Sequence, residues 1–563
     1  MSAKLKLHIS NKVYQSLRKN PATSPEKLKS LIQIGTVNGN NANMNISLDN
    51  LQNQLGISNS NDILAMKTDN VISKVYLGND RANRKISFDI DRSVFVKDVL
   101  ENINHPDIFT ERKKVVVEYS SPNIAKPFHV GHLRSTIIGN FISNINKYLG
   151  HEVVRLNYLG DWGTQFGLLK VGVDLANLTD AQIKADPLKV LYDAYVNVNK
   201  MAKYDPKINE KAREIFTKLE KGELEDISSW KLFNKYTIDE LSSLYKRLGV
   251  TFDEYNFESM YSAQNMKQVI DMLEKCKVIQ ADSDGKKVAM INDKKVSLIK
   301  SDGSMLYLTR DIAAALDRYG KYKFDQMLYV VDNSQSDHFN SLNNVLFKMD
   351  LPWAGRVKHV KFGRIRGMST RKGTAVFLKD ILNEAKELMQ KNQVKSPTTR
   401  VPISDEHTSD ILGITCVIVN DLKQRRQRDY EFDWNRVLQV QGDTGVRLQY
   451  THCRLTSLER INNITPAETC NPEFLEQPEV MNLVIHLAQF NEILRRCHQE
   501  LEACLLTVYL FHLCNYINKA LKVLRVKDQD VHLAAQRMLL FSVAKETLRQ
   551  GMEILGLQPL LEM

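Results

Sequence analysis

Residues 115–135 read V-V-V-E-Y-S-S-P-N-I-A-K-P-F-H-V-G-H-L-R-S, and this stretch decides the fold. Its opening run of β-branched residues predicts a buried strand, and apolar residues at helical spacing after Gly131 predict a helix. A strand, a loop and a helix N-terminus form an anion site, because backbone N–H groups and the positive end of the helix dipole point at the ligand. His129 and His132 would add donors there, and Gly131 between them lets a flat or phosphorylated ligand approach the backbone closely.

The following residues continue the alternation of strand and helix. Residues 152–158 predict a second strand, so the unit is β–α–β with parallel pairing, and it ends in the loop L-G-D-W-G-T-Q-F-G at 159–167. Further strand-like and helical segments follow, and we expect Thr309 to be the N-cap of a helix that runs to Leu316. Doubly wound sheets bind ligands at the carboxyl edge, so the sequence predicts an α/β fold with its site at that edge.

The composition is that of a globular protein with several domains. The chain has 563 residues, of which 43% are hydrophobic and 25% charged, so two to four domains are expected. A net charge of +11 suits a polyanionic partner such as nucleic acid. Seven cysteines without a C-x-x-C pair argue against a disulfide framework or a zinc site and favour a reducing compartment. The apolar run 503–517 is too short to span a bilayer, so no membrane association is expected.

Three strings resemble one known family. The string 115–135 resembles the first signature of class I aminoacyl-tRNA synthetases in its arginine-specific form. The string R-I-R-G-M-S-T-R-K-G at 364–373 resembles the second class I signature, and D-T-G-V-R-L-Q-Y-T-H-C-R-L at 443–455 resembles the start of the anticodon-binding bundle. The resemblance to arginyl-tRNA synthetases covers about residue 85 to the C-terminus. Val446 stands where these enzymes commonly have Pro, which makes the chain most similar to the animal mitochondrial form.

The resemblance implies a class I synthetase architecture of three domains. A small α+β added domain would occupy residues 1–105, with a loop-like middle at 37–70. A Rossmann-type catalytic domain would span 106–395, with a charged helical insertion at about 180–236, and an all-α anticodon-binding bundle would follow at 396–563.

The first 25 residues are basic and contain no acidic residue. They fit a mitochondrial transit peptide and an ordinary basic helix about equally well. The mitochondrial matrix is therefore the expected compartment, with the cytoplasm as the alternative, and a monomer is the default.

By resemblance, the protein activates L-arginine with ATP to arginyl-adenylate and pyrophosphate, and then transfers arginine to the terminal ribose of tRNA(Arg). The family generally needs tRNA for activation. Such chemistry relies on positioning and on stabilising phosphate charge, and Mg²⁺ would arrive with ATP, so no protein-bound metal is expected. Two alternatives are an RNA-binding descendant without activity and a nucleotidylyltransferase that shares H-x-G-H. The intact motif residues argue against the first, and the helical bundle argues against the second.

The resemblance assigns site residues in three groups. The catalytic group lies in the two signatures and comprises Lys126, His129, His132, Ser369, Arg371 and Lys372. The ATP-binding group comprises His129, Gly131, His132 and Met368. The arginine-binding group comprises Ser121, Pro122, Asn123, His132, Tyr307, Asp311 and Gln335.

A planar guanidinium has donors in a fixed fork that match a carboxylate bidentately. We therefore expect Asp311 to face the guanidinium with Tyr307 as the ring wall, although an acid in the first turn of a helix is the simpler reading. Glu118 and Glu258 are further acids near these motifs. Glu118 fits the pocket or a strand-end ion pair equally well, and Glu258 fits the pocket or, more simply, the surface.

One departure from the general class I pattern concerns the second signature. That motif usually carries two lysines around Met-Ser, and here Gly367 and Thr370 occupy their places. A cation is still needed against the leaving pyrophosphate, so Lys126 is the leading substitute, helped by Arg371 and Lys372.

Overall fold

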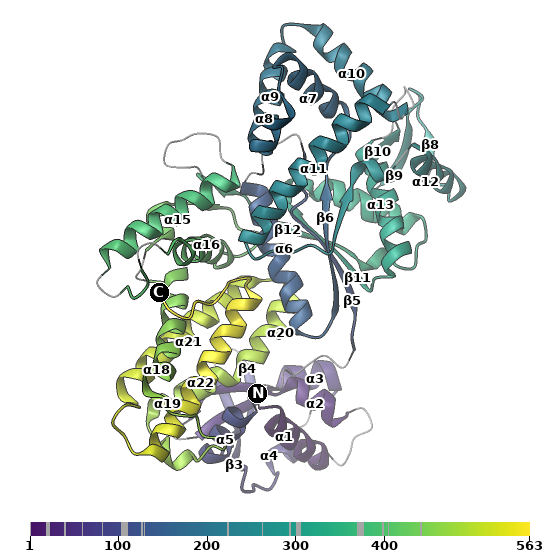
Figure 1. Cartoon of the computed structure of the whole chain (residues 1–563). Coiled ribbons are helices and arrows are strands. Elements are labelled where there is room, and N and C mark those ends of the chain that lie inside the picture. Colours follow the sequence, from purple (N-terminus) through teal and green to yellow (C-terminus); the bar gives the residue numbers. More distant parts are fainter. Residues whose placement is uncertain are drawn as a thin grey trace. The chain divides into compact units, whose positions relative to one another are not determined.

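The computed structural model forms two compact units (Figure 1). The terminal unit consists of Met1–Phe109, Gln393–Leu412 and Gln439–Met563, and the central unit of Thr110–Asn392 and Gly413–Leu438. The residues that the structure describes are 2–17, 23–38, 41–58, 60–80, 83–102, 111–124, 128, 130–221, 224–261, 263–291, 294–299, 306–368, 377–396, 399–402, 405–439 and 442–563.

The central unit is built on a five-stranded parallel sheet with the order β12-β11-β5-β6-β7. The run of three valines forms β5, where all three side chains are buried. The chain proceeds from β5 to β6 on one side and returns to β11 on the other, so the strand order reverses beside β5. This switch point opens a crevice at the carboxyl ends of the strands, and the predicted Rossmann-type sheet is confirmed. The strands are β5 (Lys114–Glu118), β6 (Glu152–Leu159), β7 (Glu254–Phe257), β11 (Gln326–Asp332) and β12 (Val357–Phe362).

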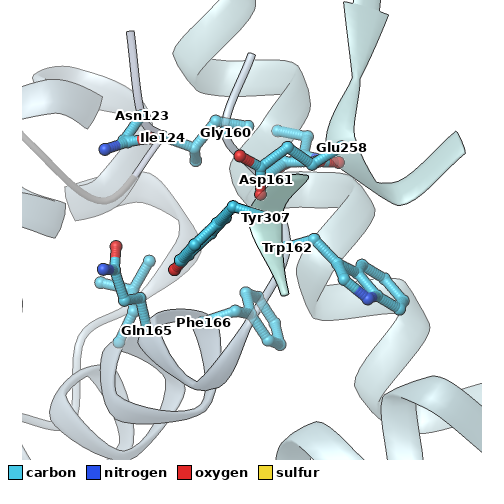
Figure 2. A pocket seen from close by; sticks show the side chains of 11 residues that line it. Asn123, Ile124, Gly160, Asp161, Trp162, Gln165, Phe166, Glu258 and Tyr307 are labelled. Atoms are coloured by element: carbon cyan, nitrogen blue, oxygen red, sulfur yellow. The ribbon is translucent and has the colours of Figure 1, made fainter. Parts of the chain in front are cut away.

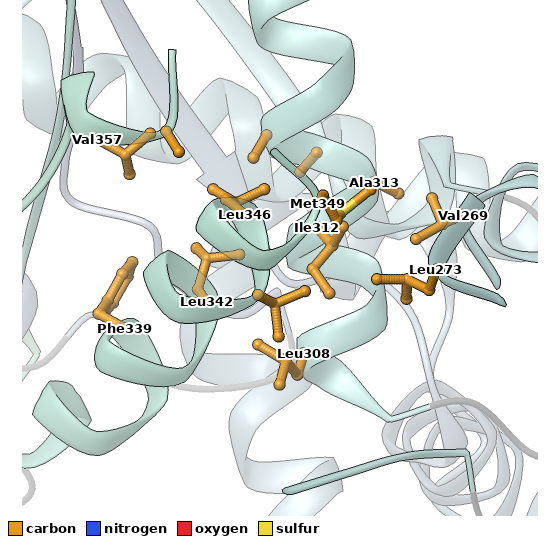
Figure 3. Close-up of a cluster of buried hydrophobic side chains, with 14 of the residues drawn as sticks. Val269, Leu273, Leu308, Ile312, Ala313, Phe339, Leu342, Leu346, Met349 and Val357 are labelled. Atoms are coloured by element: carbon orange, nitrogen blue, oxygen red, sulfur yellow. The ribbon is translucent and has the colours of Figure 1, made fainter. Parts of the chain in front are cut away.

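Helices pack on this sheet through apolar stripes. α6 (Val130–Tyr148), which carries the first signature, lies along β5, β6 and β11. α12 (Ala263–Lys275), α13 (Tyr307–Tyr322) and α14 (Ser336–Lys348) share one buried cluster, in which Figure 3 shows Leu273, Ile312 and Leu342. Each side chain of this size that is fully buried contributes roughly 1.5–3 kcal/mol.

The expected N-cap of α13 is wrong. The N-cap is Leu306, three residues earlier, the helix runs from Tyr307 to Tyr322, and the Thr309 hydroxyl donates to the carbonyl of Leu298 at 2.8 Å. Thr309 is fully buried, and its hydroxyl ties the helix to the adjacent hairpin instead of capping it.

The rest of the central unit is mostly helical. α7 (Thr164–Leu175) precedes the expected insertion at about 180–236. The insertion itself carries α8 (Asp180–Ala185), α9 (Pro187–Met201), α10 (Pro206–Lys221) and the first part of α11 (Leu224–Arg247). A small antiparallel sheet contains β8 (Ile279–Ala281), β9 (Lys287–Ile291) and β10 (Lys294–Ile299). Further elements are β13 (Ile365–Arg366), β14 (Tyr430–Glu431) and α17 (Trp434–Val437). α15 (Leu378–Lys395) and α16 (Glu406–Leu422) belong to the central unit only in part, because residues 393–412 belong to the terminal unit.

The terminal unit contains an antiparallel sheet with the order β1-β2-β4-β3. The loop-like reading of residues 37–70 is wrong, because this segment contains β2, α3 and α4. Met44 and Ile46 of β2 are fully buried, while Asn43 and Asn45 alternate with them, so the asparagines hid a period of two. The elements are α1 (Ala3–Ser16), α2 (Pro25–Leu31), β1 (Gln33–Asn38), β2 (Asn41–Ser47), α3 (Leu48–Leu55), α4 (Asn61–Leu64), β3 (Ile72–Asp80), β4 (Asn83–Ile90) and α5 (Arg92–Glu101).

The same unit includes the C-terminal bundle, and the predicted all-α character of that region is confirmed. Glu492 of α20 lies 2.5 Å from Lys6 Nζ and accepts the backbone N–H of Ile34, so the N-terminal elements pack on the bundle. The three-domain division by function stays a prediction. None of the described helices is both long and apolar enough to cross a membrane. The bundle helices are α18 (Gly445–Asn462), α19 (Pro478–Ala488), α20 (Phe490–Glu500), α21 (Ala503–Val523) and α22 (Val531–Ile554).

Candidate active site

A pocket of about 490 Å³ lies at the switch point of the sheet, and we call it the switch-point pocket. Its walls come from the carboxyl ends of β5, β11 and β12 and from the first turns of α6. It brings together four of the residues expected to bind ATP or arginine, namely Ser121, Gly131, His132 and Gln335. The sequence therefore predicted correctly that these segments meet at one sheet edge.

The turn after β5 is strained and tightly held. Ser120 and Ser121 have φ angles of 73° and 47°, in the left-handed region that costs a residue other than glycine about 1–3 kcal/mol. The Ser120 N–H donates to Ser135 Oγ at 2.9 Å, and the Ser121 N–H donates to Asn157 Oδ1 at 3.1 Å. The Ser120 hydroxyl also contacts the Tyr245 hydroxyl at 2.7 Å. These bonds fix the direction in which the chain leaves the strand for the pocket.

A second pocket of about 240 Å³ adjoins the loop after β6, and we call it the Tyr307 pocket (Figure 2). Asn123, Gln165, Glu258 and Tyr307 are among its lining residues. Gly160 permits this arrangement, because a Cβ at this position would lie 2.0 Å from Asn123 Oδ1. Of the expected arginine ligands, Asn123 and Tyr307 therefore share a pocket that is separate from the one with Ser121, His132 and Gln335.

Asp161 forms part of the wall of the Tyr307 pocket. Its carboxylate accepts the Ser259 N–H at 3.0 Å, the Ser259 hydroxyl at 2.7 Å and the Asn234 amide at 3.1 Å. Burial raises the pKa of this carboxyl, and the three hydrogen bonds oppose that rise. Asp161 thus ties the loop after β6 to α11 and to the residue beside Glu258. Sequence reasoning quoted this loop but missed Gln165 and the role of Asp161.

The two further acids have different environments. Glu118 forms a buried ion pair with Arg318, and burial raises the pKa of its carboxyl while the guanidinium opposes that rise. The ion-pair alternative is therefore the observed one for Glu118, which is not among the lining residues of either pocket. Glu258 lies 3.6 Å from Arg310 Nη1 and does line the Tyr307 pocket.

Asp311 lines neither pocket, and its Oδ2 lies 2.6 Å from His338 Nε2 of α14. Asp311 is nevertheless close to Glu118 and Glu258, the two acids just described. Burial raises the pKa of Tyr158, and the negative charges of Asp311 and Glu258 raise it further. Asp311 also adds to the raised pKa of Glu118. Asp311 and Glu258 thus act on Tyr158 together with the guanidinium of Arg318, whose carbon lies 4.9 Å from the centre of the Tyr158 ring, so acids and protein cations share this neighbourhood.

Several expected residues fall outside the described part of the chain: Lys126, His129, Ser369, Arg371 and Lys372. Met368, which directly precedes the undescribed residues 369–376, is buried. Pro122, another expected arginine-binding residue, accepts the Gly160 N–H through its carbonyl at 3.1 Å. Within the described ranges, no three His, Cys, Asp or Glu side chains are placed to hold a metal ion.

The chain matches two protein-family models. Residues 95–434 match the class I (R) tRNA synthetase catalytic domain, and residues 448–563 match the DALR anticodon-binding domain. A probable mitochondrial arginine–tRNA ligase of Mus musculus is 39% identical over 513 residues, which are 88% of each chain. The chain belongs to the class I arginyl-tRNA synthetases. The predicted family is therefore confirmed.

Other relatives of this synthetase differ in compartment. A cytoplasmic arginine–tRNA ligase of Saccharomyces cerevisiae is 42% identical over 467 residues, covering 80% of this chain and 76% of the relative. The solved structure of Thermus thermophilus arginyl-tRNA synthetase has a TM-score of 0.81 at 20% identity and covers 99% of this chain and 100% of its own. That likeness confirms the class I synthetase fold.

Proposed function

We infer that the protein is an arginine–tRNA ligase that works through the two pockets just described. It activates L-arginine with ATP and charges tRNA(Arg). In the first step an oxygen of the arginine carboxylate bonds to the α-phosphorus, the bond from that phosphorus to the β-phosphate oxygen breaks, and pyrophosphate leaves. In the second step the terminal ribose hydroxyl of tRNA attacks the acyl carbon, and AMP leaves.

We assign ATP to the switch-point pocket. Its position at the carboxyl edge beside the N-terminus of α6 supports this, because backbone N–H groups there favour phosphate. A volume of about 490 Å³ is also in the usual range of small-molecule sites. His129, Gly131, His132 and Met368 are the proposed ATP ligands, and Mg²⁺ enters with ATP as part of the substrate.

The Tyr307 pocket is the proposed site of the arginine side chain. Its neighbourhood is rich in carboxylates, and a guanidinium is matched bidentately by a carboxylate. Asp311 lies one turn after Tyr307 on α13, so both side chains are on one helix face. A carboxylate has about four acceptor positions, so the bond to His338 leaves acceptor capacity for the substrate.

We also assign partners to the α-amino and carboxylate groups of arginine and to tRNA(Arg). Ser121, Asn123 and Gln335 are the proposed partners of the α-amino and carboxylate groups, and the strained turn after β5 fixes the first of them. The catalytic roles of Lys126, Ser369, Arg371 and Lys372 rest on the signature resemblance. For tRNA(Arg), we assign the anticodon to the bundle, which the family match at residues 448–563 supports.

The compartment and the oligomeric state are proposals too. Mitochondrial and cytoplasmic relatives match at 39% and 42% identity, so family membership alone does not separate the compartments. We propose the mitochondrial matrix as the compartment, because the N-terminus is basic, and a monomer as the oligomeric state. Neither the inactive descendant nor the nucleotidylyltransferase is favoured by any feature of the described residues.

One assay tests the function directly. The chain should catalyse ATP–pyrophosphate exchange that depends on L-arginine, and tRNA(Arg) should be required for it. The acids Asp161 and Glu258 in the wall of the Tyr307 pocket carry the choice of arginine. Lysine and citrulline should give no exchange, because an ammonium lacks the planar fork of donors and citrulline lacks the charge. Exchange with another amino acid and none with arginine in the presence of tRNA(Arg) would refute the assignment.

A further inference from the structure

Arg134 is a buried charge in the first signature, two residues after His132, and the mechanism above does not use it. It lies on α6, its side chain is 1% exposed, and it borders the switch-point pocket. A fully buried guanidinium needs compensating partners, because removing it from water costs several kcal/mol. The identity of these partners indicates what the residue does.

The partners come from two segments far along the chain. Arg134 Nη1 donates to the carbonyl of Gly363 and, at 3.0 Å, to that of Arg428. Its Nε lies 3.3 Å from a carboxylate oxygen of Asp421, which is itself buried, and its guanidinium carbon lies 5.0 Å from the centre of the Tyr430 ring. The guanidinium therefore joins α6 to the end of β12, to the last turn of α16 and to the stretch after α16.

The carboxylate of Asp421, which faces Arg134, is held in place by a further hydrogen bond. Tyr430 Oη donates to Asp421 Oδ2 at 2.9 Å, so the carboxylate has a second donor. Burial raises the pKa of Asp421, and the guanidinium of Arg134 opposes that rise. We call Arg134, Asp421 and Tyr430 the Arg134 bracket.

The bracket holds the segment that leads into the second signature. Gly363 approaches the Arg428 backbone so closely that a Cβ would lie 2.7 Å from the Arg428 carbonyl carbon. After Gly363, β13 pairs with β14, and the Phe432 N–H donates to the carbonyl of Arg366 at 2.8 Å. Residues 363–366 are thus fixed on one side by Arg134 and on the other by residues 428–432.

Both ends of the bracket border the same pocket. Gly363, Arg364 and Ile365 line the switch-point pocket together with Gly131 and His132. Arg134 therefore links the helix that carries the first signature directly to the residue before the second signature. We propose that Arg134 is a positioning residue for ATP: it holds the entry to the second signature in register with the helix that carries the first. This inference rests on the proposed placement of ATP in the switch-point pocket.

The first test replaces Arg134 by Met, which keeps the length and removes the charge. Arginine-dependent ATP–pyrophosphate exchange with saturating tRNA(Arg) should lose at least tenfold in kcat/KM for ATP, with the KM for arginine within twofold of wild type. Arg134→Lys should recover only part of the loss, because an ammonium lacks the fork that reaches three acceptors. A folded Arg134→Met enzyme with unchanged ATP kinetics would overturn the proposal.

A double variant separates positioning from loss of folding. Tyr430→Phe keeps the ring beneath the guanidinium and removes only the hydroxyl bond to Asp421. It should raise the KM for ATP severalfold, and adding it to Arg134→Met should cause little further loss, because both act through one bracket. Additive losses would overturn the proposal.

The matched control is Leu273→Ala, a core truncation in α12, which contributes no described residue to either pocket. It should lower the melting temperature and leave the ratio of the KM values for ATP and arginine unchanged. If it shifts this ratio as Arg134→Met does, the effect of Arg134 is mere destabilisation and the proposal falls. The placement of ATP is tested separately by Gly131→Val, which should raise the KM for ATP; an unchanged value would put the nucleotide elsewhere.

Discussion

The burial of the basic N-terminal helix leads to a quantitative prediction about its removal as a transit peptide. α1 buries Leu5, Ile9 and Val13, which are 5%, 0% and 0% exposed. At roughly 1.5–3 kcal/mol for each buried apolar side chain, the helix contributes about 5–9 kcal/mol as an upper bound. This is comparable to the whole stability of an ordinary domain, about 5–15 kcal/mol. Removal of a transit peptide of about 25 residues would take the whole helix away.

Point variants on one helix provide the perturbation and its control. Ile9→Ala should lower the free energy of unfolding of the terminal unit by about 2–5 kcal/mol, because it leaves a cavity in a closed core. Leu7→Ala, at a position 40% exposed on the same helix, should change it by no more than about 0.5 kcal/mol. Deletion of residues 2–17 also strips Lys6 from Glu492, and it should unfold the N-terminal sheet.

The positions of the tryptophans make the assay specific. All four lie in the central unit: Trp162, Trp230, Trp353 and Trp434. In urea titrations, Ile9→Ala should therefore shift the transition seen by far-UV circular dichroism and leave the tryptophan transition in place. If Ile9→Ala behaves like Leu7→Ala, or if the deletion variant unfolds like the full chain, the helix is dispensable and the reasoning is wrong. Mass spectrometry of the protein from mitochondria should find α1 intact.

Three further predictions concern the site and the bundle. Asp311→Asn should lower kcat/KM for arginine by at least about tenfold and leave the KM for ATP unchanged, because losing one partner of a charge pair costs roughly 3–5 kcal/mol when buried and less here, where the carboxylate is 30% exposed; unchanged arginine kinetics would show that Asp311 is not a partner of the guanidinium. Lys126→Ala should lower kcat of exchange about a hundredfold, and Thr370→Lys in that background should restore part of the lost rate. A wild-type rate in Lys126→Ala would leave Arg371 and Lys372 as the pyrophosphate partners. Burial lowers the pKa of His486 to about 4, so between about pH 6.5 and 4 this residue binds a proton only in the unfolded chain. The free energy of unfolding should therefore fall by about 3 kcal/mol as the pH drops through that window. His486→Phe should reduce this pH dependence in urea titrations followed by circular dichroism.

The sheet and its edge were predictable because their signals are local. The valine run could only be a buried strand, and the helix after Gly131 follows from spacing alone. Strand β2 of the N-terminal sheet was missed for the opposite reason. In β2 the apolar residues alternate with asparagines, which are themselves buried but are rare in strands, so composition outweighed periodicity.

The parts of the site that were not predicted depend on contacts between distant segments. Nothing near Asp311 indicates that His338 will lie 2.6 Å away, and nothing near Glu118 indicates Arg318. The Arg134 bracket likewise joins residues that are almost 300 positions apart. Sequence spacing gives the type of each residue, but only the fold decides which acid meets a substrate and which meets a protein cation.

The backbone at Gly367 explains why this synthetase lacks the first lysine of the usual second signature. Gly367 has a φ of 70°, in the left-handed region that costs an ordinary residue about 1–2 kcal/mol. The backbone cannot easily relax, because β13 ends one residue earlier and is paired with β14. Gly367→Lys should therefore raise the KM for ATP despite the added cation, and Gly367→Asn should do so less, because asparagine tolerates this conformation better. A Gly367→Lys enzyme with a lower KM for ATP would mean that charge outweighs backbone geometry at this position.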